Sequence, residues 1–240
     1  MLSPPKKTAP GICILIPAYQ EEASIAAVIH ETRDFCPDAD IIVIDDGSSD
    51  GTSRAAREAG AVVLEHVRNQ GKGAALRTGF DYATQHNYEL AVTIDADGQH
   101  APSDIPAFLQ ARARTGASVL IGNRMDNLTG MPPLRRFVNR FMSALLSRQM
   151  GQYVPDTQCG FRLYHRAAFP YNELTKGSQR FAGDSEVLLR LSLRGFHIGS
   201  VPIQTIYGVE KSKINPFLDT IRFFRMLRLF KKIKKEYSPR

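Results

Sequence analysis

Short apolar runs alternate with longer amphipathic stretches along the first half of the chain. The runs at 12–16, 41–44, 62–64 and 90–94 are continuous and contain many β-branched residues, which predicts buried strands. Between them, the pattern predicts a helix from Glu21 to about Asp34 and another from the segment 69–73 to about Gln85. This alternation of strands and helices predicts an α/β fold with a mostly parallel sheet and helices on both faces.

The second half of the chain predicts two further helices. Residues 134–150 form an amphipathic stretch, and another helix is expected to begin near Phe181 and to continue to Arg194. A chain of 240 residues is long enough for one α/β domain with a sizeable core. We therefore expect a disordered segment at 1–10, a single domain at 11–212, and a basic amphipathic helix or tail at 213–240.

Two carboxylates follow the strand predicted at 90–94. Asp95 and Asp97 sit at its carboxyl end, where open α/β sheets bind ligands. Side chains at i and i+2 of an extended segment point the same way, so both carboxylates can face one cation. Such oxygen ligands suit Mg²⁺ or Mn²⁺, which substrate phosphates complete. The alternative is an acidic turn without function, and the spacing excludes an EF-hand loop.

Polar loops also follow the other predicted strands. Asp46, after the second strand, can accept hydrogen bonds from a nucleobase edge. Gly71 and Lys72 open a helix, whose N-terminus can hold an anion, although the glycines can also serve only to allow positive φ. Neither a Walker A motif nor a dinucleotide-binding fingerprint is present. The residues after the first strand either line a pocket or form a plain turn: Pro17, Tyr19 and Glu21.

Four of these stretches together resemble a known family. They are 16–22 (IPAYQEE), 43–52 (VIDDGSSDGT), 69–73 (NQGKG) and 95–100 (DADGQH). In this order and spacing they resemble the nucleotide-sugar half of family 2 glycosyltransferases, and within these the dolichyl (polyprenyl) phosphate mannose synthase group. The resemblance implies a GT-A fold, a Rossmann-like single domain whose mixed, mostly parallel central sheet is flanked by helices.

The resemblance also implies roles for individual residues on the donor side. The cation and the diphosphate would be held by Asp95, Asp97 and Gln99. The nucleoside would be held by Pro17, Tyr19, Glu21 and Asp46, with Gly71, Lys72 and Ala96 completing the donor site. The cation would neutralise charge that develops on the leaving nucleoside diphosphate.

On the acceptor side, the resemblance points to a group of basic and amide side chains. The acceptor phosphate would be held by Arg124, Arg135, Asn139 and Lys213. Family members commonly have serine where Asn139 stands. A carboxylate on this side matches Glu186, so the residues expected to act in catalysis are Asp97, Arg124 and Glu186. Cys159, in a further matching stretch, is expected to pack as a small hydrophobe rather than to act as a nucleophile.

The implied reaction is transfer of a hexose with inversion, with mannose from GDP-mannose as the first candidate, onto a polyprenyl or dolichyl phosphate. A phosphate monoester has a second pKa of ~6, so it is ionised at neutral pH and needs no strong general base. This agrees with the scattered histidines of the chain. One alternative is a family 2 enzyme that uses UDP-glucose or another nucleotide sugar with a different lipid or small acceptor. Another is a non-catalytic scaffold at a membrane.

Charge is concentrated at the end of the chain. The net charge is +7, and residues 211–240 alone contain ten Lys/Arg against two Asp/Glu. Apolar and basic residues alternate there at helical spacing, which favours a membrane surface over a packed helix or an RNA-binding tail. No signal peptide or membrane span is expected, and the three cysteines lack metal spacing. We expect a cytoplasmic protein, peripheral on the inner face of a membrane, with no nucleic-acid partner, to which a small membrane subunit could add an anchor.

Overall fold

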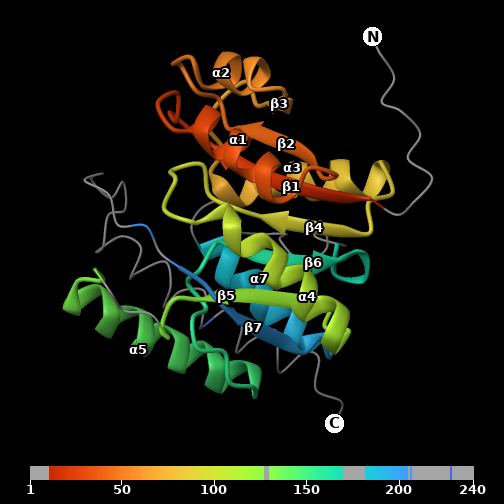
Figure 1. Ribbon diagram of the computed structural model, residues 1–240. Coiled ribbons are helices and arrows are strands. Elements are labelled where there is room, and N and C mark those ends of the chain that lie inside the picture. The colour runs from red at the N-terminus through yellow and green to blue at the C-terminus, as the bar shows by residue number, and fades with distance from the viewer. Residues whose placement is uncertain (1–10, 127–129, 170–181, 205, 207–227, 229–240) are drawn as a thin grey trace.

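The computed structural model describes residues 11–126, 130–169, 182–204, 206 and 228. They form a seven-stranded sheet in the order β3-β2-β1-β4-β6-β5-β7, with helices on both faces (Figure 1). The prediction of an α/β fold with a mixed, mostly parallel sheet is confirmed. The predictions for 1–10, for Lys213 and for all of 213–240 except residue 228 lie outside the described residues.

The four apolar runs of the first half form parallel strands, as predicted: β1 (Ile12–Ala18), β2 (Asp40–Asp45), β3 (Val62–Glu65) and β4 (Leu90–Thr93). The second half adds β5 (Val119–Asn123), β6 (Arg162–His165) and β7 (Ile198–Pro202). Only β6 runs antiparallel to its neighbours β4 and β5, whereas β5 and β7 are parallel. The carboxyl ends of β1, β2, β4 and β5 therefore meet at one edge of the sheet.

The helices connect the strands and cover them: α1 (Ile25–Phe35), α2 (Thr52–Glu58), α3 (Lys72–Gln85), α4 (Ile105–Thr115), α5 (Pro133–Met150) and α7 (Ala182–Leu193). Two short 3₁₀ turns are η1 (Pro102–Asp104) and η2 (Arg166–Ala168). Helix α1 contacts α2 and η1, while α7 contacts α3 and α5. No helix in the described part of the chain is both long and apolar enough to cross a bilayer.

The predicted start of the first helix is wrong by several residues. Helix α1 begins at Ile25, and Glu21 lies in the turn before it. Gln20 has φ of +58°, which turns the chain, and the Glu21 N–H donates to Thr52 Oγ1 at 2.9 Å. Because this contact ties the segment to the start of α2, the acidic residues belong to a loop at the sheet edge rather than to a helix.

The core consists of the strand interiors and the helix faces packed on them. Leu15 and Ile44 are completely buried, and α3 lies so close to them that a Cβ built on Gly79 would be 2.9 Å from Ile44 Cδ1. This close packing fixes α3 against β1 and β2, with its N-terminus near the carboxyl ends of the strands. The three cysteines are buried, and none of them forms a disulfide.

Candidate active site

The loops after β1, β2 and β4 are connected to one another by backbone hydrogen bonds. The Asp46 N–H donates to the Ala18 carbonyl at 2.9 Å, and the Ile94 N–H donates to the Leu15 carbonyl at 3.2 Å. At the same edge, the Ile206 N–H donates to the Gln99 carbonyl at 3.0 Å, which brings the chain after β7 beside the Asp95–Gln99 loop. The structure thus brings together the four stretches on which the family resemblance rests.

The loop after β1 packs on the loop after β2. The Gln20 N–H donates to Ser48 Oγ at 2.9 Å, and Tyr19 remains 42% exposed at the surface of this loop pair. Pro17 and Glu21 are half-buried beside it. The three residues therefore share one loop cluster with Asp46, and their contact with a nucleoside stays a prediction.

Asp46 is buried, and its carboxylate already has several partners. Oδ1 accepts from His66 Nδ1 at 2.7 Å and from the Gln70 N–H at 3.0 Å, and Oδ2 accepts from the Gly71 N–H at 2.6 Å. Asp46 thus organises the loop that leads into α3, a role that the sequence did not reveal. His66 was overlooked as a site residue, although its position directly after β3 places it at this edge of the sheet.

Lys72 and Asp95 form the central ion pair of the site. Lys72 is the first residue of α3, and its Nζ donates to Asp95 Oδ1 at 2.5 Å. Gly71, directly before the helix, adopts φ of +96°. Burial disfavours the Asp95 carboxylate, but the charge of Lys72, helped by that of Arg124, holds its pKa well below the usual range. Asp95 is therefore ionised and neutralised by the protein itself.

Asp97 differs from Asp95 in its surroundings. Burial and the charge of Asp95 raise the pKa of Asp97, and its Oδ1 accepts the Gln99 N–H at 3.0 Å. Lys72 and the Gln99 N–H offset the charge of Asp97 only in part, so this carboxylate fits a site for a hard cation such as Mg²⁺ or Mn²⁺. Among the described residues, no three His, Cys, Asp or Glu side chains form a metal cluster, so Gln99 and substrate oxygens would complete the set. Ala96 is buried, and its contact with the donor stays a prediction.

His100 is buried beneath the Asp95–Gln99 loop and contacts its backbone. Its Nδ1 accepts the Asp95 N–H at 3.5 Å, and its Nε2 lies 3.8 Å from Cys159 Sγ. Burial lowers the pKa of His100 to about 4, so the ring is neutral at physiological pH. Burial also raises the pKa of Cys159 to about 11, which keeps the thiol protonated and agrees with a packing role rather than a nucleophilic one.

Gly160 allows the Lys72–Asp95 pair to lie against the backbone. A Cβ at this position would be 2.7 Å from Asp95 Oδ2 and 2.8 Å from Lys72 Nζ. We expect Gly160→Ala to displace the pair and to lower kcat/KM by about tenfold or more, measured as initial rates of sugar transfer. Gly199→Ala is the control, because its Cβ would crowd only Leu120 Cδ2, at 2.6 Å, away from the site. Unchanged kcat/KM in Gly160→Ala would contradict this role.

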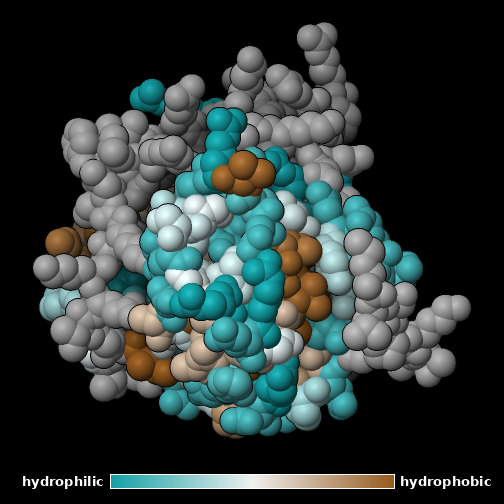
Figure 2. Space-filling model, turned by 90° about the horizontal axis from the view of Figure 1, so that it is seen from above, coloured by the Kyte–Doolittle hydropathy of each residue, from teal (hydrophilic) through white to brown (hydrophobic). Residues whose placement is uncertain are grey.

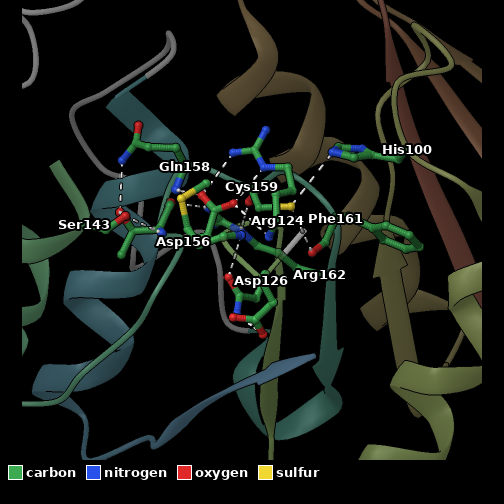
Figure 3. Close-up of polar contacts among 12 residues, drawn as sticks. His100, Arg124, Asp126, Ser143, Asp156, Gln158, Cys159, Phe161 and Arg162 are labelled. Carbon is green, nitrogen blue, oxygen red and sulfur yellow. Dashed lines mark hydrogen bonds and ion pairs between the residues drawn. The ribbon is translucent and has the colours of Figure 1, made fainter. Parts of the chain in front are cut away.

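Arg124, directly after β5, and Asp156 form a buried ion pair (Figure 3). Arg124 Nε donates to Asp156 Oδ2 at 2.7 Å and Nη2 donates to Oδ1 at 3.0 Å, a two-pronged contact. Figure 3 shows the pair beside Cys159, which lies between Arg124 and His100. The guanidinium is therefore held by the protein, and a contact between Arg124 and an acceptor phosphate stays a prediction.

Helix α5 carries the other predicted acceptor residues. Asn139 lies on its buried face, and its Nδ2 is a buried donor with no hydrogen-bond partner among the described residues. Ser143, one turn later, contacts Thr157 in the loop that holds Asp156. Arg135, near the start of the helix, is half-buried. The face of α5 that bears Asn139 and Ser143 thus faces the loop beside Arg124.

Glu186 is buried on α7. Its Oε1 accepts from Arg190 Nε at 2.9 Å, one turn along the same helix. The neighbouring Ser185 accepts from Gln158 Nε2 at 3.4 Å, which connects α7 to the loop of Asp156. The structure therefore places Glu186 near the expected acceptor side, but its catalytic role remains a prediction.

Comparisons with known proteins agree with this arrangement. Residues 13–171 match the family described as Glycosyl transferase family 2. The UDP-N-acetylglucosamine–dolichyl-phosphate N-acetylglucosaminyltransferase of Methanococcus voltae is 32% identical over 216 residues, covering 82% of this chain and 86% of its own. The polyprenol monophosphomannose synthase of Mycolicibacterium smegmatis is 30% identical over 200 residues, covering 79% of this chain and 75% of its own.

A solved structure confirms the fold. Glucosyl-3-phosphoglycerate synthase from Mycobacterium tuberculosis, in complex with UDP, superposes with a TM-score of 0.66 at 24% identity, over 92% of this chain and 79% of that one. Other crystals of that enzyme contain Mn²⁺ or Mg²⁺. Since the family match extends over well more than half of the sequence and the sheet agrees, the chain belongs to glycosyl transferase family 2 and is a glycosyltransferase with a GT-A fold.

Proposed function

We propose that this glycosyltransferase moves a hexose from a nucleoside diphosphate sugar onto a polyprenyl or dolichyl phosphate. The observation that carries the proposal is the contrast between two adjacent carboxylates. Asp95 is neutralised by Lys72, whereas Asp97 is left with a raised pKa at the edge where the donor loops meet. Such an edge suits a cation bound together with a diphosphate. Relatives named as dolichyl-phosphate or polyprenyl-phosphate transferases support the choice of acceptor.

The donor side would work through charge. Asp97 and Gln99, together with Asp95, would hold Mg²⁺ or Mn²⁺, which when bound would draw electron density from the leaving diphosphate. Lys72 lies beside Asp95 and within the same loop system, so it would face the diphosphate as a second positive charge. Pro17, Tyr19, Glu21 and Asp46 would hold the nucleoside. None of these steps requires a nucleophile from the protein.

The acceptor side would work through hydrogen-bond donors. Nδ2 of Asn139 is a buried donor without a partner in the described part of the chain, and buried donors of this kind usually bind a ligand or an ordered water. With Arg135 and Arg124 it would hold the acceptor phosphate, which attacks the anomeric carbon with inversion. Lys213 would join them. It lies outside the described residues, seven positions after the backbone contact between Ile206 and Gln99.

We also propose that α5 contacts the membrane in which the acceptor resides. Its apolar residues Leu134, Phe137, Val138 and Phe141 are exposed, and the two phenylalanine rings stack with centroids 6.3 Å apart. The helix carries four arginines and no acidic residue, which complements an anionic leaflet. In contrast, the face in Figure 2, above α2, is mostly hydrophilic with separate hydrophobic patches. The basic segment 213–240 would add charge on the inner face, and a small membrane subunit could add an anchor.

Replacing both exposed phenylalanines should separate membrane binding from folding. We expect Phe137→Ser/Phe141→Ser to bind anionic vesicles about a hundredfold more weakly or worse, because each phenylalanine that becomes buried in the membrane contributes about 1.5–3 kcal/mol. Vesicle co-sedimentation measures this, and Phe35→Ser, an exposed phenylalanine at the end of α1, is the matched control. Equal vesicle binding by both variants would rule out α5 as a membrane contact.

The donor has two candidates. GDP-mannose follows from the resemblance to mannose synthases. A UDP sugar is favoured by one observation: three protein donors already occupy the Asp46 carboxylate, which has about four acceptor positions. One remaining position suits the single N3–H of uracil better than the paired N1–H and N2–H of guanine. The relative from Methanococcus voltae is named as a UDP-sugar enzyme.

Release of nucleoside diphosphate tests the function and chooses between the donors. The protein is incubated with Mg²⁺ or Mn²⁺, anionic vesicles, and GDP-mannose, UDP-glucose or UDP-N-acetylglucosamine. We expect release with one donor, at a rate that rises when polyprenyl phosphate is added to the vesicles. If the rate of nucleoside diphosphate release were the same with and without polyprenyl phosphate, the proposed acceptor would be contradicted. Binding of all three donors without release, with the lipid present, would favour a non-catalytic scaffold.

A further inference from the structure

A chain of hydrogen bonds runs from the interior of α3 to the loop directly before Lys72. Thr78 Oγ1 lies 2.9 Å from His66 Nε2, and His66 Nδ1 lies 2.7 Å from Asp46 Oδ1. The two oxygens of Asp46 then hold the backbone N–H groups of the two residues before Lys72, at 3.0 and 2.6 Å. Lys72 is the next residue of the backbone, and its side chain donates to Asp95.

The roles of the two ring nitrogens follow from their partners. A carboxylate oxygen only accepts, so Nδ1 of His66 carries the proton that points at Asp46. In the neutral ring, Nε2 then accepts the hydroxyl proton of Thr78. Because both nitrogens are held and the His66 side chain is only 10% exposed, the ring has one orientation. It fixes the carboxylate of Asp46 in turn.

The fixed carboxylate determines the path of the next loop. Gly71 adopts φ of +96° and ψ of 156°, a conformation that residues other than glycine rarely adopt. The two N–H groups bound to Asp46 hold the loop in this path, and the path sets the direction in which Lys72 leaves the backbone. Loss of the hydrogen bond between His66 and Asp46 would let Lys72 move away from Asp95 without disturbing the sheet.

We propose that His66 is a positioning residue for the donor site, which through Asp46 holds the 70–71 loop and aims Lys72 at the diphosphate. This inference rests on the proposed donor site. It assigns His66 no contact with substrate and no part in proton transfer. As a consequence, the Asp46 side chain would couple the position of the nucleoside to the position of Lys72 at the diphosphate.

Two substitutions of His66 distinguish positioning from general stability. In His66→Asn, the amide nitrogen falls near the place of Nδ1 and can still donate to Asp46. In His66→Gln, the longer amide reaches the place of Nε2, near Thr78, and the contact with Asp46 is lost. Both variants remove the ring, so a purely structural role predicts similar losses in the two.

Binding of UDP and of GDP with Mg²⁺, measured by calorimetry on the full chain, is the test. We expect His66→Gln to weaken binding of the preferred nucleotide about tenfold or more and His66→Asn to weaken it about threefold or less. In transfer assays, the same order should appear in the donor KM, with a smaller change in kcat. Thr78→Val should resemble His66→Asn, because it leaves the contact between His66 and Asp46 in place.

The outcomes separate the inference from the function on which it rests. Equal affinities for the Asn and Gln variants would overturn the positioning role while leaving the donor site intact. Failure of the wild-type protein to bind either nucleotide would overturn the donor site and the positioning role together. Binding in the expected order without transfer to lipid would support the positioning role and contradict only the proposed acceptor.

Discussion

Asp97→Asn is expected to lower sugar transfer by about a thousandfold, with little loss of stability. The amide keeps the shape of the side chain and can still accept the Gln99 N–H, but it removes the charge that would hold the cation. Loss of several kcal/mol of electrostatic stabilisation of the leaving diphosphate corresponds to this change in rate. Initial rates of transfer at saturating Mg²⁺ or Mn²⁺ measure it, and metal-dependent nucleotide binding should be lost as well.

The stability of Asp97→Asn is part of the prediction. Because burial and the charge of Asp95 raise the pKa of Asp97, ionisation of Asp97 disfavours the metal-free fold. The variant should therefore unfold in denaturant no earlier than the wild-type protein without metal. Glu58→Gln, which removes an exposed carboxylate at the end of α2, serves as the control for a general effect of charge. Transfer within tenfold of wild type in Asp97→Asn would refute the assignment of Asp97 to the cation.

The second large effect is expected at the buried pair of Arg124 and Asp156. Asp156→Asn should lower the free energy of unfolding by about 3–5 kcal/mol, because it leaves the guanidinium of Arg124 buried beside a neutral group. Arg124→Gln should have a similar cost, since it leaves the carboxylate of Asp156 with backbone donors alone among its described partners. Denaturant unfolding followed by circular dichroism measures both.

A double-mutant cycle tests whether the two side chains act as a pair. In the double variant, an amide faces an amide and no charge is buried without a partner, so its loss of stability should be clearly smaller than the sum of the single losses. Additive losses would mean that each residue acts through other contacts. Exposed ion pairs such as that of Arg54 and Glu22 should give couplings below about 1 kcal/mol in the same experiment.

The sheet edge and its loops could be predicted from the sequence because they depend on local signals. Runs of apolar residues specify β1, β2, β3 and β4, and each run is followed directly by the polar residues of the site. The resemblance rested on these same short stretches. The predicted helix start at Glu21 failed because a distant residue, Thr52, binds that segment. A contact between residues 31 positions apart cannot be read from the local pattern of apolar and polar residues.

The partners of the predicted site residues could not be predicted for the same reason. Asp46 is held by His66 and by the loop before Lys72, twenty and more positions along the chain, and Arg124 meets Asp156 at a separation of 32 residues. Helix α5 presents a different difficulty. Its periodicity shows an apolar and a polar face but not which is buried, and the structure buries Asn139 while exposing Phe137.

The most direct test of the account is the chemical identity of the lipid product. Polyprenyl phosphate in anionic vesicles is incubated with the protein, Mg²⁺ or Mn²⁺ and the donor that supports nucleotide release, and the lipid is analysed by mass spectrometry. We expect a polyprenyl phosphate heavier by one sugar residue, formed by the wild-type protein and not by Asp97→Asn. Release of nucleoside diphosphate with an unmodified lipid would contradict it, because the sugar would then have gone to another acceptor.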